Sequence, residues 1–304
     1  MWPVTETSRD PEDRRLLESV EVTRPVARRL LVVSIAAFFG VVGVAEVVFR
    51  RFTESHVQPL TITATSPLDV FLGVAVFVAL LVVVVVPHEL LHGVFMARYG
   101  GTPEYGLGVR GLLMPSAYAR TRGAIYTRNE MLVATLAPFV VITGGGFTLA
   151  VVLEWPLLTV PAAANAAGSV GDLWIAARIR RYPSSVRIAE PPEGYDGDVA
   201  VYGFEHAERG DPGPRVRTAA TWVYGTAATL TLILAALFAS VIASLSAGSG
   251  TVVFEAPVVD GHLFRHELVN QGAAVTVGYP GLFALSALGG VAWVLISRLR
   301  TDGS

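Results

Sequence analysis

The sequence contains no cysteine and no lysine, and it carries little charge of either sign. Without cysteine the chain can form neither a disulfide nor a thiolate metal site, so a transition metal would have to bind histidine and carboxylate side chains. The formal net charge of -2 and the scattered arginines exclude the basic stripe typical of nucleic-acid-binding proteins. Hydrophobic residues make up 52% of the chain and the mean hydropathy is +0.54. This composition indicates a membrane protein.

Six apolar segments have lengths near the ~20 residues that cross a bilayer core, and they predict an all-α polytopic membrane protein. They cover residues 30–49, 68–97, 131–153, 157–177, 219–245 and 278–296. Small β-hairpins are expected in the loops between them: a hairpin within 105–126, short strands and turns in the cytoplasmic loop 183–214, and two strands at 252–255 and 273–277 in the outer loop.

The arginines predict how the chain is oriented. Positively charged loops stay on the cytoplasmic side, and most arginines lie before the first helix, between the second and third, between the fourth and fifth, and after the last. This distribution predicts a multi-pass protein of the cell membrane with both termini in the cytoplasm. Arg50 and Arg51, just beyond the first helix, run against the rule.

The sequence His88-Glu89-Leu90-Leu91-His92 closes the most apolar stretch of the chain. In a helix, the two histidines lie one turn apart on the same face, the spacing at which two ring nitrogens bind one Zn²⁺. Glu89 can then reach a water molecule at the metal and act as the catalytic base. The pattern therefore indicates a zinc hydrolase within the membrane.

Asp172 is the expected third ligand. His92 lies six residues, or ~9 Å, from the predicted inner end of its helix, and Asp172 lies six residues before Arg178 on another inward-running helix. The two side chains should thus lie at the same depth, where an acid needs a partner. Two alternatives stay open: Asp172 pairing with Arg178 or Arg181, and Glu130 replacing it as the ligand, although an acid at a helix start is the simpler interpretation of Glu130.

Other polar residues, and residues that break helices, have less specific interpretations. Asn165, about two turns before Asp172, could bind a substrate backbone or join helices. Pro138 and the glycines at 144–146 favour kinking and close helix packing. His262 and His266 follow no zincin pattern, so solvated loop histidines are expected there.

The sequence resembles a family of zincin-type peptidases of unknown substrate, which is similar to the site-2 proteases, intramembrane zinc metalloproteases. The resemblance spans roughly residues 68–198. It is carried by His88-Glu89-Leu90-Leu91-His92, Tyr99-Gly100, Tyr105-Gly106-Leu107-Gly108, Ala117-Tyr118-Ala119, Thr127-Arg128, Ala137-Pro138-Phe139 and Asn165-Ala166-Ala167-Gly168-Ser169-Val170-Gly171-Asp172. The chain differs in that Asp172 follows a glycine and precedes a leucine, where the site-2 proteases usually have Leu-Asp-Gly.

This resemblance implies a zinc metalloendopeptidase that hydrolyses peptide bonds of a membrane protein or peptide near the cytoplasmic membrane face. It implies Zn²⁺ as the cofactor, held by His88, His92 and Asp172, with Glu89 as the catalytic base. Two other functions remain open: a non-catalytic zincin-like membrane scaffold, and a transporter that uses the His/Glu/Asp cluster as an ion relay.

The expected organisation has five parts. They are an N-terminal cytoplasmic tail or surface helix (1–28), the first transmembrane helix with an outer loop (29–66), a zincin-like membrane core (67–182), a cytoplasmic loop (183–217), and two C-terminal transmembrane helices with a β-rich outer loop (218–304).

Overall fold

A computed structural model of the protein describes most of the chain. The described residues are 14–53, 60–63, 67–110, 114–194, 197, 199–204, 207–246, 251–255, 262–269, 272–277 and 279–302. Among them, five helices are long and apolar enough to cross a membrane, which indicates a multi-pass membrane protein. These candidate spans are Arg24–Phe52, Phe71–Arg98, Arg128–Val152, Pro214–Ala243 and Gly281–Arg300.

The internal contacts divide the chain into two units. The first consists of Met1–Arg24, Glu89–Ala137 and Asp172–Asp211, and the second of Pro25–His88, Pro138–Gly171 and Pro212–Ser304. The boundaries between the units fall within four helices, and residues that are neighbours in one of these helices keep the spacing that the helix gives them.

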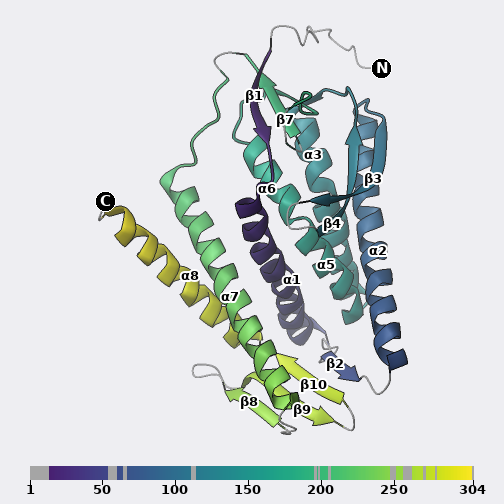
Figure 1. Ribbon diagram of the computed structural model, residues 1–304, viewed down its shortest axis with the longest axis vertical. Coiled ribbons are helices and arrows are strands. Elements are labelled where there is room, and N and C mark those ends of the chain that lie inside the picture. The colour runs from purple at the N-terminus through teal and green to yellow at the C-terminus, as the bar shows by residue number, and fades with distance from the viewer. Residues whose placement is uncertain are drawn as a thin grey trace. The chain divides into compact units, whose positions relative to one another are not determined.

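The first unit is built around an antiparallel sheet of four strands in the order β1-β7-β6-β5. Figure 1 shows β1 beside β7. The strands are β1 (Arg15–Val20), β5 (Tyr126–Thr127), β6 (Arg187–Ala189) and β7 (Val199–Gly203). Side chains from the sheet and from helix α6 (Val170–Ile179) form a shared core in which Val20, Ile179 and Ile188 are fully buried. The short strands expected within 183–214 are confirmed as β6 and β7.

A carboxylate fastens β1 to the rest of this unit. Glu18 accepts hydrogen bonds from the Tyr182 hydroxyl at 2.6 Å, from Arg209 at 2.9 Å and from Arg178. Burial alone would raise the pKa of Glu18, but these hydrogen bonds and the arginine charges together lower it. Burial, with Glu18 beside it, raises the pKa of Tyr182 to about 12, so the phenol stays a donor.

This attachment explains why the N-terminal segment differs from the expected tail or surface helix. Residues 15–20 include Leu16, Leu17 and Val20, and Val20 is fully buried in the shared core. Burial of these apolar side chains, together with the ion pairs of Glu18, favours a strand over a solvated tail.

A separate two-stranded hairpin belongs to the same unit. Strands β3 (Pro103–Arg110) and β4 (Met114–Thr121) pair antiparallel from Pro103 opposite Thr121 to Arg110 opposite Met114. The hairpin expected within 105–126 is therefore confirmed. Among the described strands, β4 pairs only with β3.

The second unit contains most of the long helices. They are α1 (Arg24–Phe52), α7 (Pro214–Ser246), α8 (Tyr279–Asp302) and the larger part of α2 (Pro67–Arg98). Apolar side chains such as Val76, Leu232 and Phe238 are about two-thirds exposed, as expected for surfaces that face lipid. A second antiparallel sheet, in the order β2-β10-β9-β8, belongs to this unit.

The second sheet differs from the expected outer hairpin, because the strand that carries His262 and His266, expected in a loop, lies between the two expected strands. Its strands are β2 (Leu60–Thr63), β8 (Thr251–Glu255), β9 (His262–Val269) and β10 (Gly272–Val277). The two strands expected at 252–255 and 273–277 are confirmed as β8 and β10. His262 and His266 lie in β9, which pairs with both of them.

The segment expected as the fourth span, 157–177, is divided into short helices. A 3₁₀ turn, η2 (Pro156–Leu158), leads into α5 (Thr159–Gly168), and α6 follows. Helices α5 and α6 have ten residues each, or about 15 Å of length, which is half of a ~30 Å hydrocarbon core. A sixth span therefore stays a prediction.

Candidate metal centre

Helix α2 carries the first two candidate ligands. Both His88 and His92 are buried, with less than a tenth of each residue exposed. The helix ends at Arg98, six residues after His92, in a Schellman arrangement: Gly101 N donates to Met96 O, and Gly100 N, at a φ of +93°, donates to Ala97 O. Glycine suits this left-handed position because it has no Cβ. The ligands thus lie about two turns before a firmly terminated helix end.

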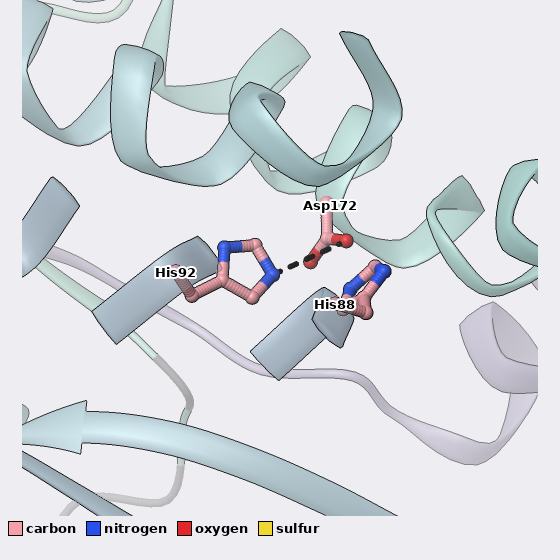
Figure 2. Close-up of side chains that lie close together, drawn as sticks. All are labelled: His88, His92 and Asp172. Carbon is pink, nitrogen blue, oxygen red and sulfur yellow. Dashed lines mark ion pairs between the residues drawn. The ribbon is translucent and has the colours of Figure 1, made fainter. Parts of the chain in front are cut away.

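Asp172, near the start of α6, is the third candidate ligand. Its Oδ2 lies 3.6 Å from Nε2 of His92, and a ligand atom of His88 completes a group whose members all lie within 4.8 Å of one another. Figure 2 shows the carboxylate facing the two imidazoles. The three residues that the sequence predicted as ligands are thus brought together from positions up to 84 residues apart.

The backbone of helix α3 (Arg128–Pro138) orients the His92 ring. Nδ1 of His92 lies 2.9 Å from the carbonyl oxygen of Ala134, and a carbonyl can only accept, so Nδ1 carries the hydrogen. In a regular helix that carbonyl would accept from the N–H of residue 138. Residue 138 is a proline and has no N–H, so the Ala134 oxygen is available to His92.

A buried amide orients the His88 ring. Nδ2 of Asn165 donates to the Pro138 carbonyl at 3.0 Å and to the Thr143 hydroxyl at 2.9 Å, which fixes which end of the amide is nitrogen. The Asn165 oxygen therefore faces His88, and it accepts from Nδ1 at 2.9 Å. Asn165 is 1% exposed, and both ends of its amide are engaged.

These hydrogen bonds make both rings suitable for a metal. With the hydrogen on Nδ1 in each histidine, Nε2 keeps its lone pair, which is the state that a metal-binding imidazole needs. Two ligand atoms bound to one tetrahedral zinc at about 2.0–2.1 Å lie roughly 3.3 Å apart, close to the 3.6 Å between His92 and Asp172. Two imidazoles and one carboxylate are also a recognised catalytic zinc set. The donor set therefore fits Zn²⁺.

Glu89 lies beside the candidate ligands in a cleft of the first unit. It is half-buried, and with His92 and Asp172 it lines a cleft of about 390 Å³. Five consecutive residues of β4, from Ala117 to Thr121, form one wall, and Ala189 to Pro191 contribute to another. A carboxylate in this position can take up and return a proton without occupying a ligand position.

Tyr126 lines the same cleft and shares a hydrogen bond of 2.7 Å with the Thr121 hydroxyl. Burial raises the pKa of its phenol, and the charge of Glu130 raises it further. The phenol is therefore protonated at neutral pH and can donate a hydrogen bond within the cleft.

The alternative partners proposed for Asp172 are engaged elsewhere. Arg178 pairs with Glu18, and Arg181 lies 3.9 Å from Asp211. Glu130, the alternative ligand, accepts from Thr127 N at 2.7 Å while its own N–H donates to the Thr127 hydroxyl at 3.3 Å. This reciprocal pair is a capping box at the start of α3, so Glu130 has the helix-start role that the sequence favoured.

Sequence reasoning missed the role of Pro138. A proline within an apolar helix was interpreted only as a kink, and a π-helical turn, η1 (Phe139–Gly144), does follow it before α4 (Gly145–Val152). Pro138 also leaves the Ala134 carbonyl without its helical donor, and this matters only because His92 approaches that carbonyl from another helix. The signal in the sequence was the proline itself, which removes the donor to residue 134 in any regular helix.

A comparison with protein families gives a match for part of the chain. None of the curated proteins and none of the solved structures that were compared with the chain matches it. Residues 81–187, roughly a third of the chain, match the model of a family described as "Putative zincin peptidase". The matched segment contains the two histidines, Glu89, Pro138, Asn165 and Asp172. The family match and the His-His-Asp group together support a metallopeptidase.

Proposed function

We propose that the protein is an intramembrane zinc metalloendopeptidase similar to the site-2 proteases, and that it cleaves peptide bonds of membrane proteins near the cytoplasmic face. One observation carries the proposal: both Nδ1 atoms donate to fixed oxygen acceptors, so that the two Nε2 atoms and the Asp172 carboxylate form a ready zinc-ligand set. Five candidate membrane spans and the zincin family match support the same conclusion.

In this proposal His88, His92 and Asp172 hold Zn²⁺. A bound Zn²⁺ supplies a Lewis acid that polarises the peptide carbonyl and lowers the pKa of water towards ~7. Glu89 takes a proton from the water molecule that attacks the carbonyl carbon. It then passes that proton to the amine nitrogen as the C–N bond breaks, so the carboxylate is regenerated in each cycle.

The cleft supports an extended peptide as the substrate. A protease can only attack a backbone that is unwound, and a strand edge holds a peptide in that form. The residues from Ala117 to Thr121 line the cleft next to Glu89, and β3 occupies only one edge of β4 among the described strands. We expect the substrate backbone to pair with the other edge of β4, beside Tyr126.

The arginine distribution supports a site on the cytoplasmic side. The segment after α2 contains several arginines, and His92 lies six residues, or ~9 Å, before Arg98 at that end of the helix. In this orientation, water reaches the zinc ligands from the cytoplasm and both termini are cytoplasmic.

Replacement of Glu89 by glutamine tests the function. Wild-type protein in detergent should cleave members of a panel of single-pass membrane peptides, read by mass spectrometry, and Glu89→Gln should retain zinc while losing cleavage by at least a hundredfold. Glu130→Gln, which removes a second half-buried carboxylate of the same unit, should retain both properties. Equal cleavage by wild type and Glu89→Gln would contradict the proposal. Zinc without cleavage in the wild type would favour the scaffold.

A further inference from the structure

Helices α7 and α8 run side by side in the second unit (Figure 1), and glycines bring their backbones into close contact midway. A Cβ atom at Gly290 would lie 2.8 Å from the backbone oxygen of Trp222, and one at Gly225 would lie 2.5 Å from Cβ of Trp293. Such contacts leave no room for a side chain, so these positions require glycine.

Beyond this contact, a groove of about 500 Å³ opens between the start of α7 and the end of α8. Val291, Val294 and Leu295 of α8 line it on one side, and Trp222 lines it from α7. Arg215 and Arg298 also line the groove, one from each helix, and none of its lining residues is acidic. The groove thus combines an apolar floor with two guanidinium groups.

The groove is basic at the ends of the candidate spans and apolar towards the bilayer interior. Arg215 lies at the start of the span Pro214–Ala243 and Arg298 at the end of the span Gly281–Arg300. The apolar residues lie further along each helix, towards the bilayer interior. Trp222 lies about two turns from Arg215, on the side of the bilayer interior.

We propose that this groove binds one anionic phospholipid. The phosphodiester lies between Arg215 and Arg298, because guanidinium groups match phosphate geometry with paired hydrogen bonds. One acyl chain lies along the apolar floor beside Val294 and Trp222. The apolar walls distinguish a lipid from a soluble phosphate, since a free anion would have no use for them, and the two positive charges distinguish an anionic lipid from a zwitterionic one.

The test measures lipid binding to the full-length protein purified in a neutral detergent. The protein is titrated with phosphatidylglycerol or phosphatidylcholine, and native mass spectrometry counts the bound lipids. We expect one tightly bound phosphatidylglycerol, and an affinity about thirtyfold lower in Arg215→Gln/Arg298→Gln, because each basic group near an anionic headgroup contributes roughly fivefold. Arg215→Lys/Arg298→Lys should restore most of the affinity.

Two further variants separate the site from general electrostatics. Arg217→Gln/Arg300→Gln removes the same charge from the same helix ends, but each residue is about 200° around its helix from the arginine of the groove, so binding should be unchanged. Ala219→Trp should fill the groove and abolish binding although both arginines remain.

The proposal is overturned if both arginine pairs matter equally, if phosphatidylcholine binds as tightly, or if inorganic phosphate displaces the lipid. None of these lipid-binding measurements depends on peptidase activity, so the lipid-site proposal and the proposed function are tested independently.

Discussion

The His92 ring donates its Nδ1 hydrogen to the Ala134 carbonyl at 2.9 Å, and this carbonyl would otherwise belong to the helical hydrogen bond that Pro138 cannot make. Because Pro138 has no N–H, it leaves the Ala134 carbonyl free to accept the hydrogen bond that orients His92. The same proline offers its own carbonyl to Asn165, which holds the His88 ring. Both histidines are thus oriented from one turn of one helix.

Replacement of Pro138 by alanine should weaken zinc binding without weakening the fold. The new N–H competes with His92 for the Ala134 carbonyl, and loss of an outer hydrogen bond to a ligating histidine costs about 10–100-fold in metal affinity. Thermal stability should be unchanged or higher, because proline is unfavourable within a helix. Competition with a chromogenic chelator measures the affinity, and Pro161→Ala, in α5, is the control. Wild-type zinc affinity in Pro138→Ala would contradict this role.

Asn165→Ala should also lower zinc affinity by about 10–100-fold, because it removes the acceptor for Nδ1 of His88. Thr143→Val is the matched control, since it removes one partner of the same amide but keeps the contact with His88. Its effect on zinc affinity should be several times smaller. If the two variants bind zinc equally well, Asn165 acts through general packing and not through His88.

Glu18→Gln should destabilise the protein at neutral pH by about 1.5–3 kcal/mol, the range for a hydrogen bond to a charged group. The pKa of Glu18 is lowered in the folded state, so its contribution is complete above the pKa of the unfolded state and is lost as pH falls through the lowered folded value. Thermal unfolding should therefore show a Tm deficit that is largest near neutral pH and disappears in strong acid. Glu21→Gln, which changes an exposed glutamate just after β1, should show no such deficit. A deficit that is constant with pH would contradict the ionic account of Glu18.

Ala119→Pro should reduce peptide cleavage at least tenfold while zinc content stays at the wild-type level. Proline removes a backbone donor from β4 and cannot extend a strand pairing. Ala119→Val, which keeps the N–H and suits a strand, should cleave normally. Unchanged cleavage by Ala119→Pro would remove the strand edge from the account of substrate binding.

Much of this arrangement could be predicted from the sequence because it depends on local spacing. The one-turn spacing of His88 and His92 and the long apolar runs are local signals. The expected proximity of Asp172 to His92 is confirmed, although the fourth span from which it was inferred stays a prediction. The roles of Asn165 and Ala134 depend on which helix faces which. Their hydrogen bonds join residues 77 and 42 positions apart, for which a single sequence offers no periodic signal.

The sheet of the first unit shows a similar limit. The segment containing Leu16 and Glu18 has mixed polarity. It forms a strand because it pairs with β7 and because arginines from distant segments form ion pairs with Glu18. The division of 157–177 into α5 and α6 could not be predicted either, because the hydropathy of the segment is similar on both sides of the break between the two short helices.

The most direct test of the central claim is the metal content of the full-length protein in detergent, by elemental analysis. Wild type, His92→Ala, Asp172→Ala and Glu89→Gln are compared after purification under zinc-replete conditions. The account predicts about one zinc per chain in wild type and in Glu89→Gln, and a loss of zinc in the two ligand variants. Wild-type protein without zinc, or zinc retained in both ligand variants, would contradict it.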